Sequence, residues 1–132
     1  GAAPALLGLA LGDDPNASIR NRKLADIGPE LRVTPAGRFL ASLGHDPAGK
    51  EILWIDYDNS IALHAVATNR PEERRLQRLA SPLPQERRIS WGCINVPKHF
   101  YATVVSPAFK GTQGVVYVLP ETRPASEVFE LN

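Results

Sequence analysis

The sequence contains no methionine, one cysteine and three histidines among its 132 residues. A single cysteine excludes an internal disulfide and leaves the redox compartment undetermined. The histidines and the cysteine lack the spacing of a ligand set, so we expect neither a metal site nor a metal cofactor. Because methionine is absent, we expect that the chain is not an intact translation product and that a leader was removed before Gly1.

An excess of charge of one sign and long apolar runs are also missing. The formal net charge is +1, which gives no electrostatic reason to expect nucleic acid or a membrane surface as partner. No apolar run approaches the roughly 20 residues that span a bilayer, so we expect no integral membrane segment. The length suits one domain and is too short for two ordinary ones, so residues 1–132 are predicted to form a single domain.

Turn-forming residues are plentiful, with 12 prolines and 10 glycines. Together with short runs of strand-forming residues, they predict a mainly antiparallel β domain with two short helices. The expected strands are residues 5–11, 39–43, 51–58, 60–66 and 115–119, with a further edge strand at 128–131. The expected helices are residues 72–80 and 97–105, the second ending before Pro107, and residues 18–31 are expected to form a loop.

The only cysteine lies in the segment Ile-Ser-Trp-Gly-Cys-Ile-Asn-Val-Pro, residues 89–97. Gly92 has no side chain, so a substrate could closely approach the thiol of Cys93. A helix that begins near Pro97 would bring its positive end close to the sulfur and favour the thiolate. A small buried core cysteine is the alternative. The preceding glycine, the polar neighbours and an isolated upstream histidine favour a nucleophile.

His64 is the isolated histidine, in the middle of the predicted strand 60–66. A free thiol has a reference pKa of roughly 8.5 and is mostly protonated at neutral pH. A nucleophilic Cys93 therefore needs a neighbouring imidazole to take its proton. On the residues alone, a hydrogen-bonded core histidine is the alternative for His64. We interpret His45 as a solvated turn residue and His99 as a surface or groove residue.

Three segments, in this order along the chain, resemble the L,D-transpeptidases, the YkuD-like catalytic domains. Residues 34–39, Thr-Pro-Ala-Gly-Arg-Phe, resemble the family's Thr-Pro-x-Gly-x-Phe element. Residues 63–65, Leu-His-Ala, are similar to its hydrophobic-His-small strand. Residues 90–95, Ser-Trp-Gly-Cys-Ile-Asn, are similar to its Ser/Thr-His-Gly-Cys-aliphatic-Asn/Arg signature. The resemblance implies a β-sandwich-like, YkuD-type catalytic domain with the cysteine in a cleft.

The sequence departs from this family pattern in two places. Trp91 stands where many members carry a second histidine, which removes a possible helper at the oxyanion site. His64 and Cys93 are 29 positions apart, wider than the usual spacing of the family. Six arginines lie in the segment between His64 and Cys93, and we expect this segment to form an Arg-rich flap above the cysteine.

The resemblance implies Cys93 as nucleophile and His64 as general base. It further implies that a backbone carbonyl next to the base orients the imidazole, which points to Ala65. The backbone N–H groups of Gly92 and Cys93 are the candidate donors to the oxyanion that acyl transfer develops.

Four further residues are predicted to contact substrate. Ser90 would shape the turn or bind substrate, and Trp91 would form a stacking wall or pack in the core. Asn95 would bind substrate or satisfy loop backbone groups. Arg88, the nearest to the nucleophile of six arginines, would hold a substrate carboxylate by a bidentate contact. The six are Arg70, Arg74, Arg75, Arg78, Arg87 and Arg88.

The function implied by the resemblance is acyl transfer on peptidoglycan stem peptides through a cysteine thioester, without a cofactor. It places the chain in the bacterial cell envelope, periplasmic or extracytoplasmic, in cell-wall biogenesis and the control of cell shape. Carbapenem-type β-lactams are the expected covalent inhibitors. The alternatives are an L,D-carboxypeptidase or crosslink hydrolase, in which water resolves the same thioester, and a non-catalytic relative that binds cell-wall peptides.

Overall fold

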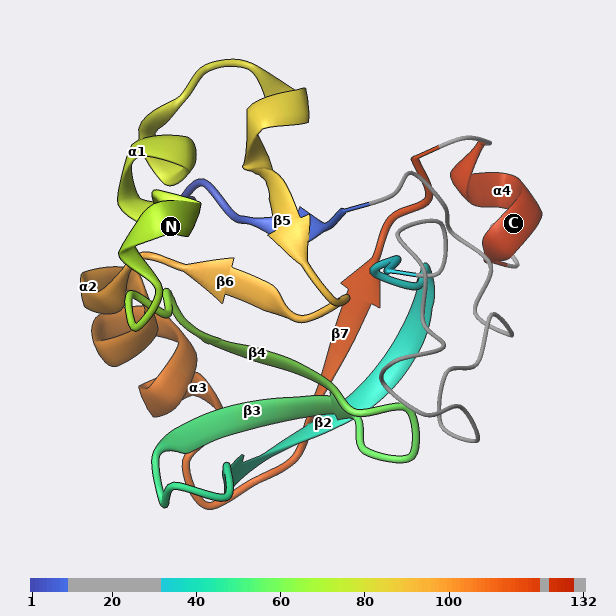
Figure 1. Cartoon of the computed structure of the whole chain (residues 1–132). Coiled ribbons are helices and arrows are strands. Elements are labelled where there is room, and N and C mark those ends of the chain that lie inside the picture. The colour runs from blue at the N-terminus through green and yellow to red at the C-terminus, as the bar shows by residue number, and fades with distance from the viewer. Residues whose placement is uncertain (10–31, 122–123, 130–132) are drawn as a thin grey trace.

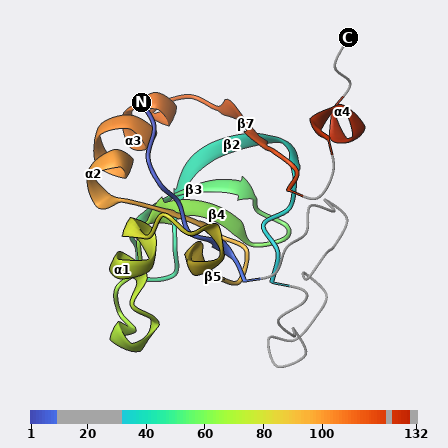
Figure 2. The same cartoon turned by 90° about the horizontal axis from the view of Figure 1, so that it is seen from above.

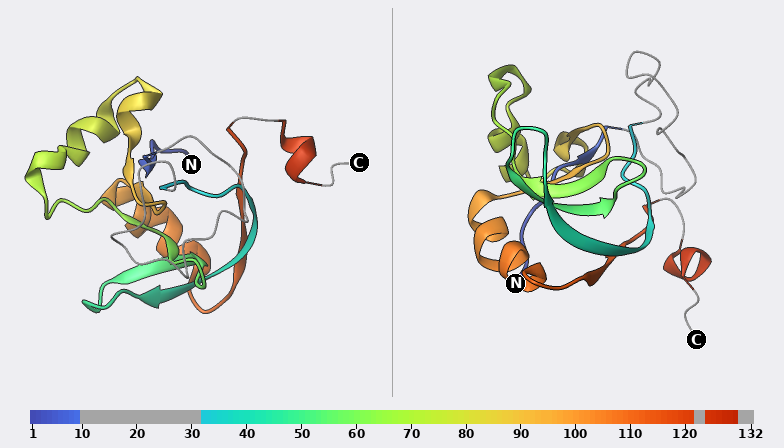
Figure 3. Two further views of the ribbon diagram at one scale, coloured as in Figure 1. Left: turned by 45° about the vertical axis from the view of Figure 1, so that its right-hand side comes forward. Right: turned by 90° about the horizontal axis from the view of Figure 1, so that it is seen from below.

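The computed structural model describes residues 1–9, 32–121 and 124–129 (Figure 1). Its main element is a curled sheet with the strand order β6-β4-β3-β2-β7. The strands are β2 (Gly37–His45), β3 (Glu51–Asp56), β4 (Ile61–Ala65), β6 (Ile94–Val96) and β7 (Gly114–Val118). Neighbours pair antiparallel except β4 and β6, which are parallel. Figures 2 and 3 show the curl from further directions.

A two-stranded parallel sheet lies beside the main sheet. It pairs β1 (Leu7–Gly8) with β5 (Arg88–Ser90). The N-terminal segment is also attached to β6, because Leu6 and Asn95 exchange two backbone hydrogen bonds of 2.8 and 3.0 Å. Backbone pairing therefore holds the N-terminal segment against β5 and β6, the strands before and after Cys93.

One face of the main sheet is covered by the helical segment that runs from α2 (Lys98–Phe100) through a π-helical turn, Tyr101–Val105, to α3 (Ser106–Phe109). Tyr101 and Val105 pack in the core with residues of β3 and β4, and Phe109 packs against it. Their spacing of four residues places all three on one helix face. The hydroxyl of Ser106 donates to the Glu51 carboxylate at 2.8 Å, which ties this segment to β3.

The architecture is mixed α/β with a curled five-stranded sheet and a few short helices, and the predicted β-sandwich is not confirmed. The apolar face of the main sheet needs a second layer, and helix supplies that layer here instead of a second large sheet. None of the helices among the described residues is long and apolar enough to cross a membrane.

The four central strand predictions are confirmed in place, at 37–45, 51–56, 61–65 and 114–118. The predicted first strand shrinks to Leu7–Gly8, while its end and the predicted loop 18–31 lie in residues outside the described part. The predicted edge strand at 128–131 is wrong at its start, because α4 spans Ala125–Val128, and residues 130–132 lie outside the described part. The strand β6 was not predicted.

Both helix predictions need correction. The expected helix at 72–80 is divided into a 3-10 turn, Pro71–Glu73, and α1, Arg75–Ala80, because Arg74 between them is left-handed with φ 51°. The second helix does not end before Pro107 but continues to Phe109. The wide π turn ahead of Pro107 loosens the hydrogen-bond ladder that a proline would otherwise break.

Candidate active site

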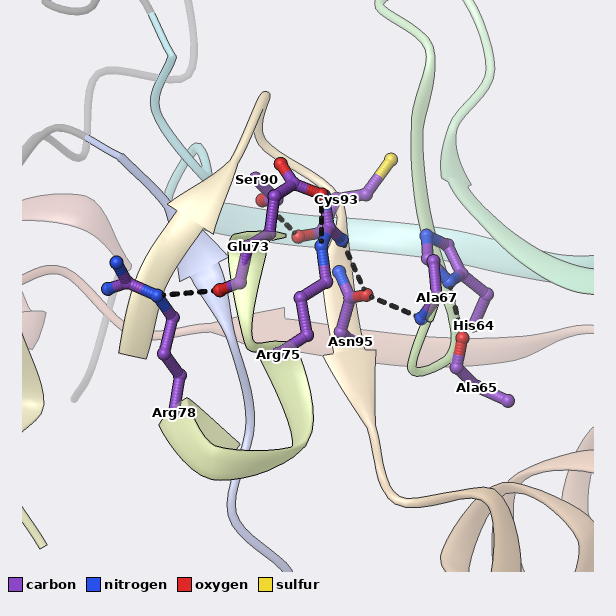
Figure 4. Close-up of polar contacts among 9 residues, drawn as sticks. All are labelled: His64, Ala65, Ala67, Glu73, Arg75, Arg78, Ser90, Cys93 and Asn95. Atoms are coloured by element: carbon purple, nitrogen blue, oxygen red, sulfur yellow. Dashed lines mark hydrogen bonds and ion pairs between the residues drawn. The ribbon is translucent and has the colours of Figure 1, made fainter. Parts of the chain in front are cut away.

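His64 lies on β4, on the face opposite the helical layer. Its Nδ1 atom lies 2.8 Å from the carbonyl oxygen of Ala65, the next residue (Figure 4). A carbonyl oxygen only accepts, so Nδ1 carries the proton and Nε2 presents its lone pair. The contact that the sequence analysis placed at Ala65 is therefore present, and it leaves the imidazole in the tautomer that a general base needs.

Cys93 stands one residue before β6. The parallel register pairs Leu63 with Ile94 and His64 with Asn95, so Cys93 lies beside the start of β4, close to Ala62. Its Sγ atom donates a weak hydrogen bond to the carbonyl oxygen of Ser60 at 3.6 Å. Ala62 and His64 share one strand face, so the thiol and the imidazole reach the same side of the sheet.

Burial sets the ionisation of both groups. Burial lowers the pKa of His64 below its ordinary value, while the bond to Ala65 opposes the shift and the charges of Arg75 and Lys50 add to it. Burial raises the pKa of the Cys93 thiol, while a hydrogen bond from the backbone of Ala62 and the charge of Arg75 act to lower it. At neutral pH the resting pair is therefore a neutral thiol and a neutral imidazole. This ionisation state suits general-base transfer of the thiol proton.

The two side chains face one cavity of about 300 Å³. Its floor comes from neighbouring strands and includes Ile52 and Trp54 of β3. Asp46 and Lys50, from the turn between β2 and β3, also line it. An aromatic floor beside charged groups suits a ligand with both apolar and polar parts.

Gly92, just before the cysteine, adopts a conformation that an L side chain rarely takes, with φ +134°. A Cβ atom there would lie 2.7 Å from Ile61 Cδ1 and 2.8 Å from the carbonyl oxygen of Val33. The carbonyl oxygen of Gly92 accepts from Thr34 Oγ1 at 2.8 Å. Thus the Thr-Pro element and β4 together fix the backbone that carries Cys93.

The predicted oxyanion donors need correction at Gly92. The N–H of Gly92 donates to Ser90 Oγ at 3.1 Å, and the same hydroxyl donates to the carbonyl oxygen of Cys93 at 2.6 Å. Ser90 is buried and does not line the cavity, and its hydrogen bonds fit the first of its two expected roles, shaping the turn. Of the two predicted oxyanion donors, the N–H of Cys93 is therefore the one that does not donate to Ser90.

The other predicted substrate contacts also lie outside the cavity lining. Arg88 forms a bidentate contact with the carboxylate of Glu121, which occupies the fork that was assigned to substrate. Trp91 is exposed, and the guanidinium of Arg32 lies 3.6 Å from its ring centroid. Asn95 is fully buried, so its role is structural: its Oδ1 accepts from the backbone N–H of Ala67 at 3.3 Å.

Arg75 is the arginine whose charge lowers the pKa of both His64 and Cys93, and sequence reasoning did not single it out. Its Nη1 atom donates to Asn95 Oδ1 at 2.9 Å, and its Nε atom donates to Glu73 at 3.1 Å (Figure 4). Asn95 lies beside His64 in the register of β4 and β6. The bond to Asn95 therefore holds the charge of Arg75 close to His64. No sequence signal separates Arg75 from its neighbours. In contrast, the strand alternation that places Ile52 and Trp54 on one face could have predicted the cavity floor.

The Arg-rich connection, residues 66–87, does not form the expected flap over the cysteine. Only Ala67 of this connection lines the cavity. Leu79 of α1 is buried in a small cluster with Leu6 and Val66, and Ile89 packs against it. This apolar contact holds the connection at the side of the small sheet, where Figure 1 also shows it.

Comparisons with protein-family models, with curated proteins and with solved structures found no match. Among the residues that the structure describes, no group of three or more His, Cys, Asp or Glu side chains is arranged to hold a metal ion. The functional assignment therefore rests on the sequence resemblance and on the geometry around Cys93 and His64.

Proposed function

We propose that the chain is a cysteine-dependent acyltransferase of the L,D-transpeptidase type that acts on peptidoglycan stem peptides in the bacterial cell envelope. The observation that carries the proposal is the oriented His64 imidazole in one cavity with the only thiol of the chain. A core histidine and a core cysteine would have no reason to line an open cavity together. The motifs around both residues supply the substrate class.

The first half-reaction forms the thioester. Sγ of Cys93 attacks the carbonyl of the L-centre that precedes a terminal D-residue, and Nε2 of His64 takes the thiol proton. The N–H of Cys93 is the remaining candidate to stabilise the oxyanion. The imidazolium then gives its proton to the departing amine of the D-residue, and the acyl group stays on sulfur.

The second half-reaction returns the enzyme to its resting state. The amine of a second stem peptide loses a proton to His64 and attacks the thioester, which releases the thiolate as leaving group. The burial that raises the pKa of Cys93 favours reprotonation of that thiolate, so the neutral pair is restored. Water in place of the amine would make the same enzyme an L,D-carboxypeptidase or crosslink hydrolase.

Intact-mass measurement tests the proposal directly. The full chain is incubated with a stem tetrapeptide or with a carbapenem, and a covalent adduct is expected on wild type and not on Cys93→Ala. Product analysis with and without an acceptor stem then separates transfer from hydrolysis. If neither reagent modifies Cys93 while iodoacetamide does, the catalytic proposal is wrong.

A further inference from the structure

A second cavity, of about 230 Å³, lies against the Arg-rich connection. Thr68 lines it, and the preceding residue, Ala67, lines the cavity of the reacting pair. Its lining includes Arg70, Arg74 and Arg75 and no Asp or Glu residue. A hollow with three cations and no anion in its lining favours an anionic ligand.

The three arginines differ in how they are held. Arg75 is fixed by Glu73 and Asn95, so its charge is partly neutralised and its position is set. Within residues 1–9, 32–121 and 124–129, neither Arg70 nor Arg74 takes part in an ion pair. Both are exposed and line this cavity, and Arg74 also lines a further cavity together with Arg78 and Glu86. The side chains of Arg70 and Arg74 are therefore available to a ligand.

The backbone arrangement supports the same interpretation. Arg74 has φ 51°, a left-handed conformation that is uncommon for a residue with a side chain. Its N–H donates to the carbonyl oxygen of Pro71 at 3.0 Å, which closes the turn between the two helical pieces. The turn brings Arg70 and Arg74 to one hollow, where a continuous helix was predicted from the sequence.

We propose that this second cavity is a carboxylate-binding subsite in which Arg70 and Arg74 bind the ligand and Arg75 forms the fixed positive wall. The inference rests on the proposed function and deepens it: the peptide substrate carries a free carboxylate beside the part that reacts with Cys93. Guanidinium groups bind carboxylates by paired, charge-assisted hydrogen bonds. The role first assigned to Arg88 thus passes to two residues of the connection.

Calorimetric titration of the full chain tests the subsite without any turnover. The probe is N-acetylglutamate, a dicarboxylate, and its diamide is the neutral control. Arg70→Gln/Arg74→Gln should weaken dicarboxylate binding by about tenfold or more, which corresponds to a loss of about 1.4 kcal/mol of binding free energy or more. The control variant Arg38→Gln/Lys98→Gln removes two exposed charges that line neither cavity. It should change the affinity for the dicarboxylate by less than about twofold.

Two results would overturn the subsite: equal binding of dicarboxylate and diamide by wild type, or unchanged binding in Arg70→Gln/Arg74→Gln. The wild-type comparison decides the matter even where the double variant fails to fold. The proposed function has its own readout, the mass adduct on Cys93 from a stem tetrapeptide. Arginine-dependent binding of the dicarboxylate without an adduct keeps the subsite and removes the function, while an adduct without dicarboxylate binding does the reverse.

Discussion

The hydroxyl of Thr34 donates a hydrogen bond of 2.8 Å to the carbonyl oxygen of Gly92, 58 positions further along the chain. The same hydroxyl oxygen accepts from the backbone N–H of Gly8 at 2.9 Å. One buried side chain thus joins the N-terminal segment, the Thr-Pro element and the turn before Cys93. The contact thus links three segments that are distant in sequence, and it adds to the backbone pairing of β1 with β5.

Thr34→Val should lower the free energy of unfolding by about 2–3 kcal/mol, because valine keeps the shape and leaves two buried backbone groups without their partner. Thr34→Ser keeps the hydroxyl and should stay within about 1 kcal/mol of wild type. Urea denaturation of the three proteins measures the difference. Equal midpoints for Thr34→Val and wild type would show that the contact contributes nothing to stability.

Gly92→Ala should be strongly destabilising, by about 3 kcal/mol or more, because strain at φ +134° adds to the clash of the new Cβ with Ile61 and Val33. Gly111→Ala is the matched control. Gly111 also has a positive φ, +73°, but a Cβ there meets nothing within 4 Å. The control should therefore cost only about 1–2 kcal/mol. Equal losses in thermal or urea unfolding would contradict the role of the close contacts.

His64 should make the fold sensitive to acid. Because the pKa of His64 is lower in the folded chain than in the unfolded chain, its contribution to stability is present above the unfolded value and is lost as pH falls through the folded value. Wild type should therefore lose more stability than His64→Gln between about pH 7.5 and about pH 5. Denaturation at a series of pH values measures both slopes, and parallel curves would argue against a buried neutral imidazole.

Iodoacetamide alkylation should show which arginine acts on the thiol. The raised pKa of Cys93 predicts slower alkylation at neutral pH than for a free thiol, with a rate that keeps rising above the ordinary thiol pKa. Arg75→Gln removes a charge that lowers this pKa, so it should slow alkylation at about pH 8 by roughly two- to fivefold. Arg88→Gln, whose partner is Glu121, should leave the rate as in wild type. The opposite ranking would restore Arg88 as the neighbour of the nucleophile.

Local patterns predicted the central sheet because strand alternation and turn residues are properties of neighbouring positions. The hairpin formed by 51–56 and 61–65 was visible for this reason. The break at Arg74 and the continuation past Pro107 depend on a left-handed residue and on a π turn. Neither has a signature in a single sequence, so both helix predictions were wrong at those points.

The reacting pair could be predicted because the motifs contain it, while its surroundings could not. Cys93, His64 and the Ala65 carbonyl were expected from short segments, and the structure brings all three to one place. The roles expected for Arg88 and Gly92 depended on what else competes for their hydrogen bonds. Glu121 and Ser90 take those bonds, and only tertiary structure shows such competition.

The parallel pairing of β4 with β6 aligns the backbone that carries His64 with the backbone that follows Cys93. Parallel neighbours need a long return path, and the Arg-rich connection is part of that path here. The register of His64 with Asn95 is set by the backbone pairing of β4 with β6 and not by the sequence of this path. A substitution at an exposed position of the connection can therefore alter the proposed carboxylate subsite while the backbone alignment of His64 and Cys93 is kept.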